Sequence, residues 1–231
     1  MSKWIYLKSN NPADALALAS VIATSDTNFN IVRRSNASKF FKGMENVVVD
    51  FYVPGEESEM TVIEDIDSDS WKQKCDTIAS ILGLEVNADY KPYDGFVRHI
   101  ADVEKRVEEN STCLLYLFPH PDQHLDLLLV DHLVRLLEFQ GIKSVSGGTY
   151  MIPCIKGTAD LRQIIDYDVL CAVLPKLNFV ITSENSVAAL CEAYGKKAFV
   201  ISHIDGLTFD GLHMMDANQI LNYINQKINN L

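Results

Sequence analysis

Residues 4–23 have the sequence WIYLKSNNPADALALASVIA, and this stretch decides the fold class. The short apolar run at 4–7 predicts a strand, and the Ala- and Leu-rich segment at 14–23 predicts a helix. A polar loop joins the two. A strand followed directly by a helix is typical of a βαβ unit, in which the strands of the sheet are parallel.

The same alternation continues along the chain. Residues 47–49 are three valines, a β-branched run that is typical of a strand buried on both faces. A second series starts at 113–118, CLLYLF. Its further predicted strands are 142–146, 179–182 and 198–201, and its predicted helices are 124–140, 158–165, 169–174, 185–194 and 216–228. We therefore predict an α/β protein with two doubly wound, Rossmann-like halves, residues 1–110 and 111–231, whose parallel sheets face a cleft.

Composition and charge exclude several classes of protein. The 231 residues are 48% hydrophobic, which suits a packed core and argues against an intrinsically disordered chain. No apolar run approaches the roughly 18–20 residues of a membrane-spanning helix, and residues 1–8 turn polar too early for a secretory signal peptide. A net charge of −11 opposes tight nonspecific binding to nucleic acid. The five scattered cysteines lack CxxC spacing and indicate reduced thiols, so we expect a cytoplasmic protein.

The loop after the first predicted strand carries the first candidate site. In open α/β sheets, ligands bind beyond the carboxyl ends of the strands, where loops meet helix N-termini. The polar residues of this loop are Lys8, Ser9, Asn10, Asn11 and Asp14. Asp14 has two interpretations. It could cap the helix or complement its dipole, or it could act as a general base that takes a proton from an attacking hydroxyl.

Two other segments carry residues that a metal could use. His120, Asp122 and His124 follow the strand at 113–118, and His-Pro-Asp resembles part of a motif in zinc-dependent N-acetylsugar deacetylases. We favour a polar loop that touches a phosphate over a metal site there. The triplet Asp67-Ser68-Asp69 lies in the acidic segment 54–70, which has no Lys or Arg and predicts a solvated loop or edge segment. In so acidic a stretch the DxD pattern is expected by chance.

The strand-to-helix turn at 182–186, TSENS, carries the last candidate site. Its hydroxyls and free backbone amides suit a diphosphate. The alternative is ordinary helix capping by Ser183 together with Ser186.

Three of these segments together resemble the heptosyltransferases of glycosyltransferase family 9. Residues 5–16 resemble the opening of that family, in which a Lys/Arg-Ser/Thr-rich loop precedes Gly-Asp-Val/Ala-Leu at a helix start. Residues 179–197 resemble its second signature, Val-Ile-x-x-Asp-Ser/Thr-Gly-Pro-x-His-Leu followed by Ala-Leu-Gly-Lys-Pro. Residues 122–125 resemble the loop that contacts the donor phosphates. The chain is a short and divergent match, because Gln123 stands for the usual Lys, Glu184 for Asp and Ser186 for Gly.

The resemblance implies a GT-B-like fold and a metal-independent, inverting glycosyltransferase that uses a nucleotide-diphosphate sugar. It implies an acceptor-side half at 1–110, a donor-side half at 111–231, and Asp14 as the general base. The residues expected to bind the donor are Lys8, Gln123, Ser183, Glu184, Asn185 and Ser186, and those expected beside the acceptor are Ser9, Asn10, Asn11 and His120. No metal or other cofactor is expected.

Two rival functions stay open. The changed donor signature would also suit a GT-B-like protein that binds a sugar nucleotide or a partner chain without catalysis. A metal-dependent hydrolase or deacetylase built on His120, Asp122 and His124 is the lesser alternative. The acceptor implied by the resemblance is a glycan. A small molecule is also compatible with the short chain, whereas the acidity disfavours a modified DNA base.

Overall fold

The computed structural model describes most of the chain as two compact units. The residues described are 2–33, 37–51, 60–68, 70–87, 89–110, 113–118, 127–148, 151–202, 208–210, 212–213 and 216–228. One unit comprises Met1–Val97 together with Glu192–Tyr194, and the other comprises Arg98–Cys191 together with Gly195–Leu231.

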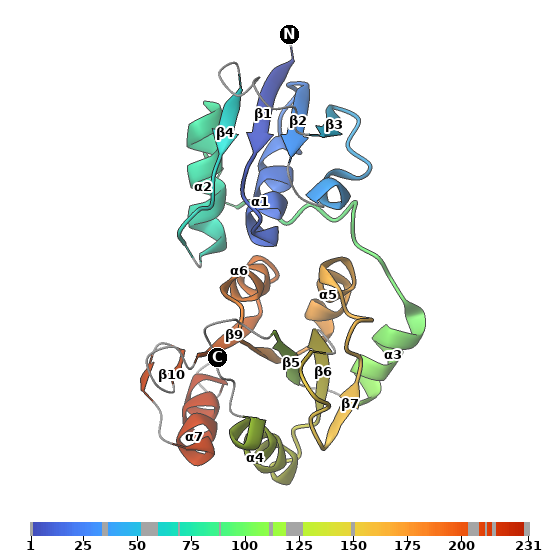
Figure 1. The fold of residues 1–231 in the computed structure, drawn as a ribbon, viewed down its shortest axis with the longest axis vertical. Coiled ribbons are helices and arrows are strands. Elements are labelled where there is room, and N and C mark those ends of the chain that lie inside the picture. The colour runs from blue at the N-terminus through green and yellow to red at the C-terminus, as the bar shows by residue number, and fades with distance from the viewer. Residues whose placement is uncertain are drawn as a thin grey trace. The chain divides into compact units, whose positions relative to one another are not determined.

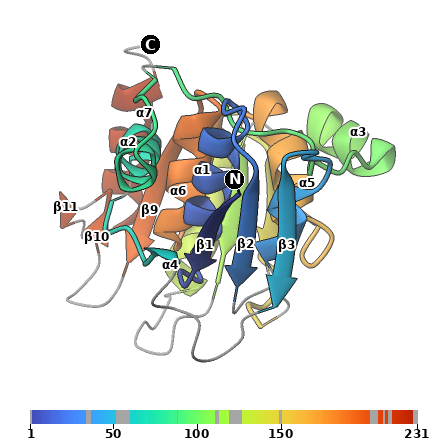
Figure 2. The ribbon, with the colours of Figure 1, turned by 90° about the horizontal axis from the view of Figure 1, so that it is seen from above.

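The first unit is built on a four-stranded sheet. Its strands are β1 (Lys3–Leu7), β2 (Phe29–Arg33), β3 (Val47–Phe51) and β4 (Thr61–Ile63), in the order β3-β2-β1-β4. Every neighbouring pair is parallel, and the arrows of β1, β2 and β3 point the same way in Figure 2. The strand order reverses at β1, since β2 lies on one side of it and β4 on the other.

The described residues of this unit form the helices α1 (Pro12–Ile22) and α2 (Trp71–Leu82) and the 3-10 helix η1 (Ala37–Phe41). The Asn11 side chain caps α1 by accepting a hydrogen bond from the Ala13 N–H, and Pro12 starts the helix. All side chains of α1 after Pro12 are buried, as expected for a helix that is apolar on every face. Gly83 ends α2 in the left-handed conformation, with φ of 62°.

The second unit contains a seven-stranded sheet. Its strands are β5 (Cys113–Leu117), β6 (Ser144–Gly148), β7 (Thr158–Asp160), β8 (Phe179–Thr182), β9 (Lys197–Ser202), β10 (Thr208–Phe209) and β11 (Leu212–His213). The order is β11-β10-β9-β8-β5-β6-β7. The strands from β9 to β7 are parallel, and β10 and β11 add an antiparallel hairpin at one edge. The strand order reverses at β5, between β6 and β8.

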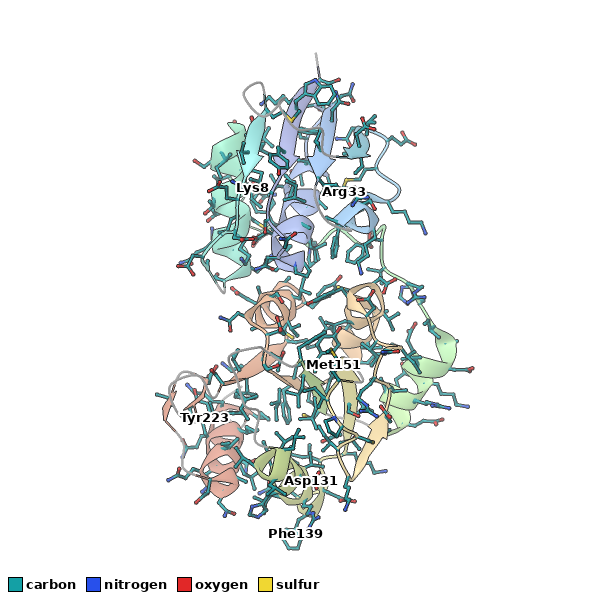
Figure 3. The ribbon with its side chains drawn as sticks, viewed as in Figure 1. Lys8, Arg33, Asp131, Phe139, Met151 and Tyr223 are labelled. Carbon is teal, nitrogen blue, oxygen red and sulfur yellow. The ribbon has the colours of Figure 1, made fainter. Side chains whose placement is uncertain are left out.

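The helices of the second unit are α3 (Ala101–Asn110), α4 (Leu127–Phe139), α5 (Tyr167–Val173), the 3-10 helix η3 (Leu174–Lys176), α6 (Asn185–Ala193) and α7 (Ala217–Ile228). Helices α4 and α7 pack side by side (Figure 1). Their apolar faces share one core with the strands, to which Leu133, Phe199 and Ile220 contribute. Phe139 projects from the end of α4 and is 92% exposed (Figure 3).

The predicted α/β fold with parallel sheets is confirmed, and two details differ from the prediction. The helix predicted at 158–165 is wrong, because Thr158 and Ala159 pair with β6 and Gln163 adopts a φ of 60° that no helix accommodates. The units divide between Val97 and Arg98, so α3 lies with the second unit, where it contacts α5 and β6. The predicted boundary near Asn110 had placed this helix in the first half.

Within the described residues, no helix combines the length and apolar character that a bilayer crossing requires.

Candidate functional site

Each sheet has one point at which its strand order reverses, and ligands of open α/β proteins bind at the carboxyl ends of the strands there. In the first unit this point lies between β1 and β4. In the second unit it lies between β5 and β8. The turns after β1 and after β8 are two of the segments predicted from the sequence to carry a site.

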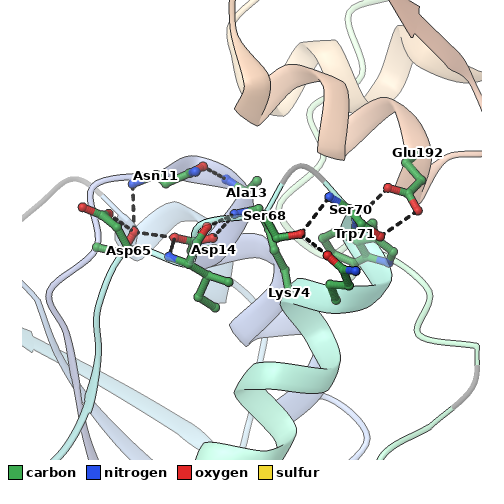
Figure 4. Close-up of polar contacts among 12 residues, drawn as sticks. Asn11, Ala13, Asp14, Asp65, Ser68, Ser70, Trp71, Lys74 and Glu192 are labelled. Carbon is green, nitrogen blue, oxygen red and sulfur yellow. Dashed lines mark hydrogen bonds and ion pairs between the residues drawn. The ribbon is translucent and has the colours of Figure 1, made fainter. Parts of the chain in front are cut away.

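The turn after β1 holds Asp14 in a buried ion pair (Figure 4). The Asp14 side chain is fully buried, and Oδ1 lies 2.6 Å from Nζ of Lys74 on α2, which is 1% exposed. Lys74 also donates to the carbonyl of Ile66 at 2.8 Å. The other oxygen of Asp14, Oδ2, accepts hydrogen bonds from Ser9 Oγ at 2.7 Å and from the Ile66 N–H at 3.1 Å. Both oxygens of the predicted general base are therefore occupied by protein donors, and a substrate would reach Asp14 only after these partners moved.

The Ser9 hydroxyl joins two carboxylates. Its oxygen lies 2.7 Å from Oδ2 of Asp14 and 2.6 Å from Oδ1 of Asp65. It also accepts a hydrogen bond of 3.0 Å from the Asn11 N–H. The Ser9 N–H donates to the carbonyl of Ile63 at the end of β4, which fixes the turn. Ser9 is buried whereas Asp65 is exposed, so the hydroxyl links a buried carboxylate to one that solvent reaches.

The other predicted residues of this turn have separate positions. Lys8 is half-exposed and forms a 2.9 Å ion pair with Glu64. Asn10 is exposed. Asn11 caps α1, so the capping role that was the alternative for Asp14 belongs to Asn11 instead. Asp14 lies in the first turn of the helix, where a carboxylate also complements the dipole.

Lys74 and Asp65 also belong to this group, although neither was predicted from the sequence. A signal for Lys74 was present, because the buried residues of α2 include Trp71, Lys74 and Ile78 at helical spacing. A lysine on the apolar stripe of a helix needs a buried partner of opposite charge. Asp65 carried no comparable signal, since it was one of several acidic residues in its segment.

The turn after β8 uses its hydroxyl groups to tie main-chain segments together. The Ser183 hydroxyl accepts a hydrogen bond from the Phe118 N–H at 2.9 Å and donates to the Phe118 carbonyl at 3.1 Å. Phe118 follows β5, so this side chain joins the carboxyl ends of β5 and β8. Thr182 is fully buried, and its hydroxyl accepts from the Glu184 N–H at 3.0 Å. Ser183 is therefore engaged with Phe118 and does not cap α6.

The N-terminus of α6 follows directly. Asn185 is the first residue of the helix and is exposed, Glu184 is half-buried, and Ser186 is 6% exposed. The N–H groups in the first turn of a helix have no acceptor within the helix and attract anions. Burial raises the pKa of nearby Tyr167 to about 12, against the opposing influence of the Ser186 hydroxyl. Tyr167 is therefore a neutral phenol at physiological pH.

Several predicted residues lie outside the described part of the chain. These are His120, Asp122, Gln123 and His124, together with Asp69 of the DxD triplet. Their predicted roles remain predictions. Among the residues that the structure does describe, no group of three or more His, Cys, Asp or Glu side chains is arranged to hold a metal ion.

Comparison with known proteins shows a likeness in structure only. No family model matches the sequence, and no curated protein matches it. The glycosyl transferase family 9 protein from Veillonella parvula superposes with a TM-score of 0.63 at 9% identity, covering 99% of this chain and 98% of that one. E. coli heptosyltransferase WaaC with ADP superposes with a TM-score of 0.58 at 11% identity, covering 98% of this chain and 97% of that one.

A third similar structure belongs to another class of enzyme. It is a Listeria monocytogenes protein provisionally assigned as a UDP-N-acetylglucosamine 2-epimerase, with a TM-score of 0.56 at 8% identity, covering 100% of this chain and 89% of that one. At such low identities a likeness establishes the fold and leaves the reaction to be argued from the site. The chain has the GT-B-like fold of these glycosyltransferases.

Proposed function

We propose that this protein transfers a sugar from a nucleotide-diphosphate donor to an acceptor hydroxyl, with inversion at the anomeric carbon and without a metal ion. The acceptor oxygen forms a bond to the anomeric carbon while the bond to the donor phosphate breaks, and the leaving diphosphate takes the electron pair. The acceptor proton passes to a cluster of side chains in the first unit. This cluster is built around Asp14 and includes Ser9, Lys74 and Asp65.

The observation that carries this proposal is the position of two polar turns in a GT-B-like fold. Both follow strands at the point where a sheet reverses its order, and one contains carboxylates while the other ends in a helix N-terminus. The first arrangement suits the acceptance of a proton, and the second suits the charge of a leaving diphosphate. With no metal ion, the first-turn amides at Asn185 and Ser186 would stabilise that charge, and Gln123 is proposed to assist them.

A binding protein without catalysis is the second candidate, and the burial of Asp14 favours it. A base must come within hydrogen-bond reach of the proton that it removes. Both oxygens of Asp14 are occupied by Lys74, Ser9 and Ile66, and the side chain has no exposed surface. A protein that binds nucleotide sugars yet neither transfers nor hydrolyses them would support this candidate. The metal-dependent hydrolase stays the lesser proposal, and one bound zinc ion per chain in metal analysis would support it.

Thermal shift with a panel of nucleoside diphosphates and nucleotide sugars tests the proposal. A ligand at about 100 times its dissociation constant stabilises a protein by roughly 2.7 kcal/mol, which a melting curve resolves. We expect at least one nucleotide sugar to raise the melting temperature and to be consumed when acceptors are supplied. If no member of the panel shifts the melting temperature, the donor site does not exist.

The variant Asn185→Asp locates the donor site. A carboxylate at the first residue of α6 repels a diphosphate, while the same charge is favourable to the helix itself. We therefore expect the ligand-induced shift to fall and the melting temperature of the free protein to hold. Asn218→Asp makes the same change on an exposed residue in the first turn of α7 and serves as the matched control. Equal shifts in both variants would place the diphosphate elsewhere.

A further inference from the structure

Ser9, Asp14, Asp65 and Lys74 form a hydrogen-bonded group in the first unit. This group has one hydrogen too few for all its contacts. The Ser9 hydroxyl has one hydrogen, yet its oxygen lies within 2.7 Å of Asp14 Oδ2 and within 2.6 Å of Asp65 Oδ1. Two ionised carboxylates can each only accept a hydrogen bond. Ser9 therefore satisfies one of them, and its oxygen faces the other carboxylate without a hydrogen between them.

One added proton on Asp65 completes every contact in the group. A protonated Asp65 donates to Ser9 Oγ, and Ser9 then donates to Asp14. Ser9 Oγ also accepts from the Asn11 N–H, so it makes one donated and two accepted hydrogen bonds. Asp14 keeps its bonds to Ile66 and Lys74 unchanged.

Burial decides which carboxylate a proton from outside can reach. Both oxygens of Asp14 already accept hydrogen bonds, Oδ1 from Lys74 and Oδ2 from Ser9 and Ile66. Asp14 is also closed to solvent, whereas Asp65 is exposed. In this series of hydrogen bonds, Asp65 is thus the carboxylate that a proton from outside can reach.

Asp65 also lines a depression in the surface of the first unit. The depression has a volume of about 480 Å³, and its lining includes Val62, Thr77 and Ile81 together with Asp65. Ligand pockets commonly have volumes of about 300–1,000 Å³, so there is room for an acceptor group beside this carboxylate.

We propose that Asp65 is the catalytic base of this protein and that Ser9, Asp14 and Lys74 are the residues that position it. The proposal rests on the proposed glycosyl transfer and names the residue that receives the proton. As the acceptor oxygen attacks the anomeric carbon, its O–H bond breaks and the proton moves to the Asp65 carboxylate. The bond from the anomeric carbon to the donor phosphate breaks at the same time, and the diphosphate leaves with that electron pair.

The variant Asp65→Asn separates catalysis from stability. An asparagine amide donates a hydrogen bond and so imitates the protonated carboxyl group towards Ser9, but it accepts no proton. We expect the rate of sugar transfer to fall by about 10²–10⁴-fold, the usual contribution of a general base. The melting temperature should exceed that of the wild type, because the amide supplies the missing hydrogen. Asp26→Asn, on an exposed carboxylate of the first unit that does not line the depression, is the matched control and should leave the rate unchanged.

A double-mutant cycle with Ser9→Ala supplies a readout other than activity. If the amide acts through the Ser9 hydroxyl, the gain in melting temperature from Asp65→Asn disappears in the Ser9→Ala background. Wild-type transfer rates in Asp65→Asn would overturn the catalytic role. If Asp65→Asn lowered the melting temperature by the same amount in the wild-type and Ser9→Ala backgrounds, the inference that the group lacks a proton would be wrong. If wild-type protein transfers no sugar, the proposed function fails together with the role of Asp65 in it, while the cycle still decides whether the group lacks a proton.

Discussion

The turns after β1 and β8 follow parallel strands that lie beside the reversal point of their sheets, yet they use polar side chains in opposite ways. The first turn directs charged groups inward, where Asp14 and Lys74 neutralise each other out of contact with water. The second turn uses the neutral hydroxyls of Thr182 and Ser183 to fix the main chain. The first is therefore held by electrostatics and the second by neutral hydrogen bonds. Substitutions in the two turns should differ in cost accordingly.

The largest expected effect is that of Asp14→Ala. Removing one partner of a buried ion pair leaves an uncompensated charge at Lys74, and the free energy of unfolding should fall by about 3–5 kcal/mol. Asn11→Ala, which removes the actual cap of α1, should cost only about 0.5–2 kcal/mol. Urea unfolding of the two variants measures the difference. Equal losses would mean that the ion pair stabilises no more than a helix cap.

The burial of Lys74 also decides how Asp14→Asn should change the stability of the protein. If Asp14 were only a cap, asparagine would replace it at little cost. Because its partner Lys74 is buried, Asp14→Asn should also destabilise the protein. Adding Lys74→Met should restore much of the stability that either single variant loses. Strictly additive losses in the double variant would contradict the pairing.

An intermediate effect is expected in the turn after β8. Ser183→Ala removes two neutral hydrogen bonds to Phe118, each worth about 0.5–1.5 kcal/mol, and should cost about 1–3 kcal/mol of unfolding free energy. The neighbouring variant Asn185→Ala changes an exposed side chain and serves as the control. If Ser183→Ala proved as costly as Asp14→Ala, the proposed contrast between charged and neutral turns would fail.

The smallest expected effect concerns an ion pair that lies near the surface. The Asp160 carboxylate accepts hydrogen bonds from Arg162, and this holds its pKa below the usual value of 3.8. A depressed pKa in the folded state gives stability that is present at neutral pH and is lost as the pH falls through the acid range below about pH 5. Because Asp160 is partly exposed, the loss should stay below about 1 kcal/mol. Unfolding of wild type and Asp160→Asn at pH 7 and at about pH 3 measures it, and identical pH dependence would contradict this assignment.

Local sequence patterns predicted helices and strands, but they did not predict contacts between residues that lie far apart in the sequence. The strand, loop and helix at 4–23 follow from neighbouring residues, and β1 and α1 occur there. Asp14 and Lys74 are 60 positions apart, and Ser9 and Asp65 are 56 apart. The sequence marked the turn as polar, but only the packing of α2 and the pairing of β4 with β1 show which side chains meet.

The error at 158–165 has a related cause. Thr158 is β-branched and joins β7, and this pairing to β6 overrides a weak helical pattern. In the turn after β8, Ser186 proved to be buried, so a bulky substitution there would disturb packing before it tested binding. Exposed Asn185 could not be distinguished from it by sequence, because both occur in one short polar run.

The ion pair between α1 and α2 also limits how this sequence can evolve. A single mutation at position 14 or at position 74 leaves the other charge buried, and such a protein would lose a large part of the 5–15 kcal/mol that typically separates folded from unfolded chains. The two positions can therefore change together far more readily than one at a time. Homologous sequences should exchange this pair as a unit, with an apolar pair as the most accessible replacement.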